Sequence, residues 1–194
     1  MKRRVLISVF ALVFAATVVV AVNALRGPRQ DGPLQTTNSR FNVRAPLAPE
    51  QILVWGRDLP WDPAVGDIRI ASIEPVGTRG LEVLGLVLNN SVLQADGTCL
   101  AYAGARYAFS FPPPGIPTRE VEGAVLEAAH GKTCISHTSV LVGVRRPPDS
   151  SAGRIDALRM LYVHEGSTYE LVMLHSLDVC PPQPNTQFCP ESGP

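Results

Sequence analysis

Two methionines and one histidine form the clearest group of possible metal ligands in this sequence. Met160, Met173 and His175 lie on two neighbouring segments of β type that a tight turn would join. If Gly166-Ser167 forms the tip of that turn, Met160 pairs with Met173, and Leu158 pairs with His175. Thioether and imidazole ligands suit Cu(I), which makes these three residues the copper candidates. Methionine is also a common core side chain, and core packing is the preferred interpretation, so we expect no metal or cofactor.

The cysteines are predicted to form two disulfide bonds rather than a reactive or metal-binding site. An even number of cysteines in an exported domain is typical of disulfides, and four cysteines permit three pairings. Cys180 and Cys189 bracket a proline-rich loop, while Cys99 and Cys134 each begin a strand-like run. We therefore expect the pairs Cys99–Cys134 and Cys180–Cys189, with the other two pairings left open. The sequence has no CxxC pair, which argues against a thiolate metal cluster.

No arrangement of nucleophile and base typical of an enzyme is present. A serine hydrolase usually carries its nucleophile in a GxSxG turn, and the sequence contains none. The acidic pair Glu120 and Glu122 has the pattern of solvated strand or turn residues. We therefore predict that the protein is not an enzyme and has no catalytic residues, and an envelope hydrolase is only the third hypothesis.

Two tryptophans are the candidate partner surface. Trp55 and Trp61 bracket the segment Arg57-Asp58-Leu59-Pro60. Large aromatic side chains at such positions commonly fill the edge of a core. Alternatively, they form an exposed aromatic rim that binds a carbohydrate or a protein.

The elements that would position these residues are short β-type runs separated by turn residues. An antiparallel β-sandwich of about seven or eight strands over residues 51–180 fits this spacing, followed by a Pro-rich tail over residues 181–194. Residues 121–129 could instead form a short helix, because their apolar residues do not alternate cleanly. The expected strands are Ile52–Trp55, Asp67–Ile73, Leu81–Leu88, Cys99–Phe111, Arg119–Ala128, Cys134–Val144, Ile155–His164 and Thr168–Leu177. At the level of fold only, this architecture resembles the Ig-like sandwiches that bacteria export on a single N-terminal anchor.

Alternation assigns the hairpin side chains to two faces. Leu158, Met160 and Tyr162 share one face with Leu171 and Met173. The opposite face is also largely apolar, so we expect the hairpin to lie centrally, covered on both sides, or at an interface.

The N-terminus has the pattern of a single membrane anchor. Residues 1–4 are a basic cytoplasmic stub, and the uncharged run from Val5 to Leu25 is about as long as a bilayer core is thick. The alternative is a signal peptide cleaved after Ala24, which would make the protein secreted. Residues 26–50 are polar and rich in turn residues, and we expect them to form a flexible tether.

Charge and location limit the possible partners. The formal net charge is zero and no basic stripe is present, so nucleic acid is not an expected partner. These features predict a single-pass membrane protein with its domain outside the cytoplasm of a bacterium. We expect a non-catalytic binding or scaffolding module with an envelope protein as its partner. The alternative is a carrier of a small ligand or of copper.

Overall fold

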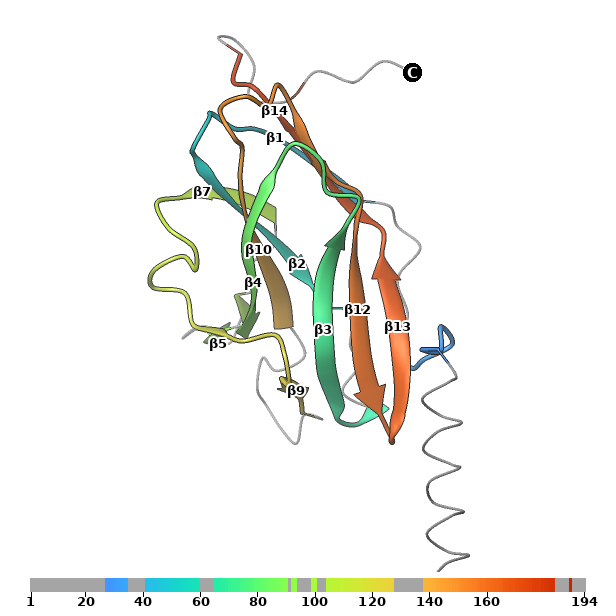
Figure 1. Cartoon of the computed structure of the whole chain (residues 1–194). Helices are drawn as coiled ribbons and strands as arrows, with labels where there is room; N and C mark the ends of the chain where they lie inside the picture. Colours follow the sequence, from blue (N-terminus) through green and yellow to red (C-terminus); the bar gives the residue numbers. More distant parts are fainter. Residues whose placement is uncertain are drawn as a thin grey trace, which may run out of the picture.

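Strands make up nearly all the regular structure among the residues whose placement is described. The computed structural model describes residues 27–34, 41–59, 65–90, 92–93, 99–100, 104–127, 138–183 and 189. Within these residues the fold is all-β, and the sheets form a sandwich-like arrangement, which confirms the predicted fold class at that level (Figure 1).

The described residues form fourteen strands, more than the seven or eight expected, because several predicted runs are divided and the strands Phe41–Pro46 and Val92–Leu93 lie outside the predicted runs. The expected strand Cys99–Phe111 is two strands, and so is the expected strand Arg119–Ala128. In chain order the strands are β1 (Phe41–Pro46), β2 (Ile52–Asp58), β3 (Ile68–Val76), β4 (Glu82–Asn90), β5 (Val92–Leu93), β6 (Cys99–Leu100), β7 (Gly104–Ala108), β8 (Thr118–Arg119), β9 (Val125–Leu126), β10 (Thr138–Arg145), β11 (Gly153–Ile155), β12 (Ala157–His164), β13 (Ser167–Met173) and β14 (His175–Cys180). The sheet orders are β7-β2-β10-β4-β8, β13-β12-β3-β9, β1-β14-β11 and β5-β6.

The five-stranded sheet is apolar on both faces at its centre. Alternate side chains of β2 and β10, such as Trp55 and Val142, belong to the main core. The side chains between them, Val54 and Leu141, form a second apolar cluster on the opposite face. This explains why β10 is buried along almost its whole length.

A proline-rich loop over residues 109–117 covers the second cluster. Phe111 and Ile116 pack against this cluster. The Phe111 ring lies so close to Gly143 that a Cβ there would overlap it, and it would lie 3.2 Å from a Cβ on Gly85. The Phe111 ring can therefore pack directly on the sheet because these two positions carry no side chain.

The hairpin of β12 and β13 has the predicted faces but a different register. His164 pairs with Ser167, Met160 with Leu171, and Leu158 with Met173. The turn consists of Glu165 and Gly166, with φ of 46° and 73°. Positive φ at both central residues is typical of the type I′ turn, whose twist suits a two-residue hairpin.

The predicted pairing of Met160 with Met173 was therefore wrong by two residues. A shift of two residues leaves each side chain on its original face, so the predicted sharing of faces holds. The expected central position was wrong as well, because β13 is an edge strand of its sheet. Val172 on its outer face is exposed, and so is Leu174, which follows the strand.

Residues 27–34, which we call the strap, are joined to the edge of β13 (Figure 1). The Arg29 amide donates to the Thr168 carbonyl at 3.1 Å, and the Glu170 amide donates to the Arg29 carbonyl at 2.7 Å. Leu34 is buried in the main core, and its amide donates to the Tyr162 hydroxyl at 3.3 Å. The strap thus adds both edge pairing and core packing to the domain.

Residues 41–50 also belong to the domain. The strand β1 pairs in parallel with β14, and the Leu47 amide donates to the Cys180 carbonyl at 2.8 Å. The expectation of a flexible tether over residues 26–50 was therefore wrong for the described part of that segment, because its apolar side chains, including Ala45 and Leu47, are buried in the core.

None of the residues described here forms a helix with the length and apolar character needed to cross a membrane. The expected span, residues 5–25, lies outside the described residues.

Candidate functional site

A shallow groove lies between the start of β2 and the end of β7. Its volume is about 320 Å³. The lining residues are Glu50, Gln51, Ile52, Tyr107, Ala108 and Phe109. We call it the β7 groove.

A tight turn before β2 holds one wall of the β7 groove. The Gln51 amide donates to the Ala48 carbonyl at 3.3 Å, and the Ala48 amide donates to Gln51 Oε1 at 3.2 Å. The Glu50 amide donates to the Arg146 carbonyl at 3.1 Å. Glu50 has a φ of 62°, which is uncommon for a residue other than glycine. The turn therefore holds the backbone of Glu50 at the edge of the groove.

Two aromatic side chains form the opposite wall. Tyr107 is about half exposed, and its hydroxyl donates to the Pro46 carbonyl. Partial burial raises the pKa of Tyr107. Phe109 is fully exposed to solvent, with a relative accessibility of 104%. One ring is thus held by a hydrogen bond, and the other is presented to solvent, which is unusual for phenylalanine.

The charge at the groove comes from a shared ion-pair cluster. Arg145 Nη1 lies 3.3 Å from Glu50 Oε2, and Arg145 Nη2 lies 2.7 Å from Glu82 Oε2. The hydrogen bonds that Arg145 donates to Glu82 raise the pKa of Arg145, so its guanidinium stays charged. Two carboxylates therefore share one guanidinium, and of these three residues only Glu50 lines the groove.

The Arg146 guanidinium, next in the chain, serves a structural purpose. Its side chain is buried, its Nε donates to the Leu47 carbonyl at 2.7 Å, and its Nη1 donates to the Ser150 carbonyl. These bonds join the segment before β2 to the loop after β10.

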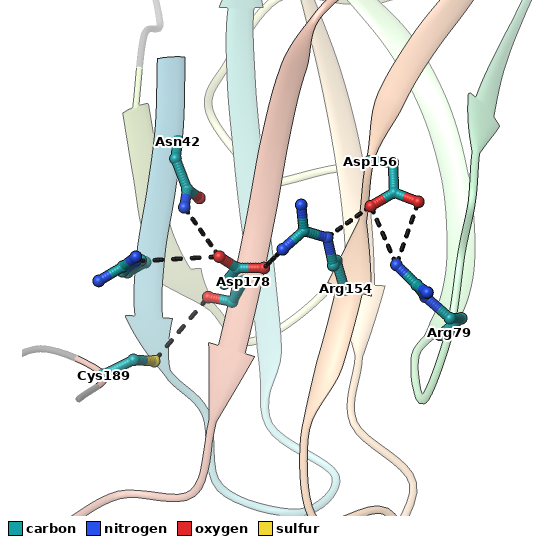
Figure 2. Close-up of polar contacts among 7 residues, drawn as sticks. Asn42, Arg79, Arg154, Asp156, Asp178 and Cys189 are labelled. Atoms are coloured by element: carbon teal, nitrogen blue, oxygen red, sulfur yellow. Dashed lines mark hydrogen bonds and ion pairs between the residues drawn. The ribbon is translucent and has the colours of Figure 1, made fainter. Parts of the chain in front are cut away.

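A second polar cluster crosses the three-stranded sheet (Figure 2). Asp178 Oδ1 lies 3.1 Å from Arg154 Nη1, and Asp156 Oδ1 lies 3.1 Å from Arg79 Nη2. The hydrogen bond from Arg154 is the main cause of the lowered pKa of Asp156. The row of alternating charges runs through Arg44, Asp178, Arg154, Asp156 and Arg79, and Asn42 also donates to Asp178. Because each charge in this row is paired with an opposite charge beside it, the row is typical of a structural feature that joins neighbouring strands.

One of the two predicted disulfides is present among the described residues. Cys180 and Cys189 are bonded, with a Cα–Cα distance of 5.6 Å. Cys189 Sγ also lies 3.9 Å from the Asp178 carbonyl (Figure 2). The side chain of Cys99 and all of Cys134 lie outside the described residues, so that pairing stays a prediction.

The copper candidates lie in the interior. Met160 and Met173 are almost completely buried within the main core, and His175 is only 3% exposed. Burial lowers the pKa of His175, and the nearby charge of Arg57 lowers it further. The three residues therefore form no metal site open to solvent, because all three side chains are buried. Among the described residues, no three His, Cys, Asp or Glu side chains are grouped so that they could hold a metal ion.

The predicted tryptophan surface is not formed by Trp55. Its side chain is 2% exposed and packs in the main core from the centre of β2, so its proposed part in an exposed rim was wrong. Trp61 lies outside the described residues. The structure instead exposes Tyr107 and Phe109, which the sequence analysis missed. The signal was the placement of Tyr107, Phe109 and Phe111 at alternate positions before three prolines.

Comparison of the chain with protein-family models and with curated proteins gives no match.

Proposed function

We propose that this chain is a non-catalytic binding module, held in a bacterial membrane by residues 5–25, with its domain outside the cytoplasm and a protein as its partner. The observation that carries the proposal is the β7 groove, where Tyr107 and Phe109 present aromatic surface beside an edge strand. Exposed aromatic side chains are enriched where proteins bind one another. The finer assignment of the sandwich as Ig-like is part of the same proposal and is supported by the two-layer arrangement.

The disulfide supports a location outside the cytoplasm. Disulfides such as Cys180–Cys189 form and persist in oxidising compartments. The basic residues Lys2, Arg3 and Arg4 before the apolar run support the same orientation, because positive residues favour the cytoplasmic side.

The position of the β7 groove suits a partner that approaches from the side away from the membrane. The strap pairs with β13 beside the β12–β13 turn. Glu50 lies at the other end of the sandwich, where β1 ends beside Cys180 and β2 begins (Figure 1). A strand of 8 residues such as β12 covers about 25 Å between these ends.

In-cell photocrosslinking tests this function. A photoreactive phenylalanine analogue at Phe109 in the full-length protein should give one dominant protein adduct. The matched control places the same analogue at Val172, which is exposed on the other sheet. Equal adducts from both positions, or none from Phe109, would contradict the proposal and favour the alternative of a small-ligand carrier.

A further inference from the structure

The residues that line the β7 groove carry negative charge and no positive charge. Of its six residues, Glu50 is the only charged one, and its side chain is 57% exposed. The rings of Tyr107 and Phe109 add the negative potential of their π faces. A surface built from a carboxylate and aromatic rings is complementary to a cation.

Two of the neighbouring cations, Arg145 and Arg146, are already paired with other groups. Arg145 is shared between Glu50 and Glu82, which leaves the three-residue cluster with a net charge of −1. Arg146 is buried and directs its guanidinium to the Leu47 and Ser150 carbonyls. Both guanidinium groups are therefore engaged by other groups of the protein, and of the two carboxylates only Glu50 lines the groove.

The backbone beside the groove suits an extended ligand. β7 is an outer strand of the five-stranded sheet, and it pairs with β2 from Gly104 to Ala108. Edge strands bind extended peptides through main-chain hydrogen bonds, while pockets beside the edge select the side chains. Glu50, with its left-handed φ, and Phe109 lie at the end of this edge.

We infer that the β7 groove binds an extended peptide segment of the partner and places a lysine or arginine side chain between Phe109 and Glu50. This inference rests on the proposed function and specifies the chemistry of the partner. The segment adds to the edge of β7, and the cation stacks on the exposed ring while its charge meets the carboxylate.

Binding of defined peptides to the purified full-length chain in detergent tests the inference. The probe is a fluorescent heptapeptide of alternating threonine and valine with a central arginine, and the matched peptide carries citrulline, which keeps the shape and removes the charge. The arginine peptide should bind about tenfold more tightly, which corresponds to about 1.4 kcal/mol. Equal affinity of the two peptides, or binding of neither, overturns the inference.

Single substitutions locate the binding. Phe109→Ala and Glu50→Gln should each remove most of the preference for arginine, and Phe109→Ala should leave the fold intact because that ring is fully exposed. Leu174→Ala, at an exposed position just after β13, is the control and should change nothing. Binding of glycans at Phe109, or a preference for arginine that survives both groove substitutions, overturns the inference.

Different results would contradict the proposed binding function and the proposed cationic segment. A protein crosslinked through position 109, combined with peptides that show no charge preference, would overturn the cationic segment and leave the binding function in place. Absence of any crosslinked protein would contradict the binding function itself.

Discussion

At the scale of single residues, His175 gives the domain a defined sensitivity to acid. Its side chain is buried, and its pKa is lowered from the ordinary value of about 6.5, chiefly by burial and then by Arg57. Above that pH the imidazole is neutral in both the folded and the unfolded states and contributes no pH dependence. Below it the unfolded chain takes up the proton more readily, so the free energy of unfolding falls as the pH falls.

Urea unfolding at pH 7.5 and pH 5 measures this effect. His175→Leu should reduce the loss of stability between the two pH values. Met173→Leu, a substitution in the same core without a titrating group, should keep the full loss. A wild-type pH dependence that persists unchanged in His175→Leu would show that other groups cause it.

Arg146 offers a second prediction at this scale. Arg146→Met should lower the free energy of unfolding by about 2–4 kcal/mol, because the Leu47 and Ser150 carbonyls lose a charged donor in a buried site. Arg69→Met, at an exposed position on β3, should change stability by no more than about 0.5 kcal/mol. Chemical denaturation of both variants makes the comparison, and equal effects would contradict the bracing role of Arg146.

At the scale of elements, the loop over residues 109–117 and the five-stranded sheet should be energetically coupled through Phe111. Gly143→Ala forces a methyl group into the Phe111 ring and should cost about 1–3 kcal/mol. In a Phe111→Ala background the same methyl group has room, so its cost should largely disappear. A double-mutant cycle measured by denaturant unfolding gives this coupling, and additive effects would contradict the packing.

For the hairpin of β12 and β13, the sequence predicted which side chains share a face. It did not predict the register of the two strands or which face packs against the core. Alternation placed Met160 and Met173 on one face correctly, because a register error of two residues does not change faces. The register depended on a positive φ at Glu165, a residue type that rarely marks a type I′ turn. Alternation also cannot say which face packs inward, and the copper candidates depended on that choice.

The groove could not be predicted for a different reason. Glu50 and Tyr107 are far apart in the sequence, and they meet only because β7 pairs with β2. Trp55 comes just after the segment interpreted as a tether, and it was expected at the edge of the core or in an exposed rim. That segment is itself part of the fold, because β1 lies within it and contributes a buried apolar side chain to the main core. The sequence pattern did not reveal this burial.

At the scale of the whole molecule, the strap makes the residues that follow the apolar run an integral part of the domain. Only Arg26, Gly27 and Pro28 separate Leu25 from the first strand-like contact at Arg29. If residues 5–25 span the membrane, the domain is held close to its surface, with the β7 groove directed away. A flexible tether of 25 residues would instead let the domain turn freely.

Two glycines of the strap distinguish these arrangements. A Cβ on Gly32 would overlap the Tyr162 hydroxyl and the Tyr169 ring, whereas a Cβ on Gly27 would meet nothing within 4 Å. Gly32→Ala in the full-length protein should therefore release the strap, and Gly27→Ala should have no effect. Hydrogen exchange reports the release, because the Glu170 amide is protected by its bond to the Arg29 carbonyl. If the strap is an integral part of the domain, the Glu170 amide should exchange faster in Gly32→Ala alone. Equal exchange in both variants would instead favour the interpretation of this segment as a flexible tether.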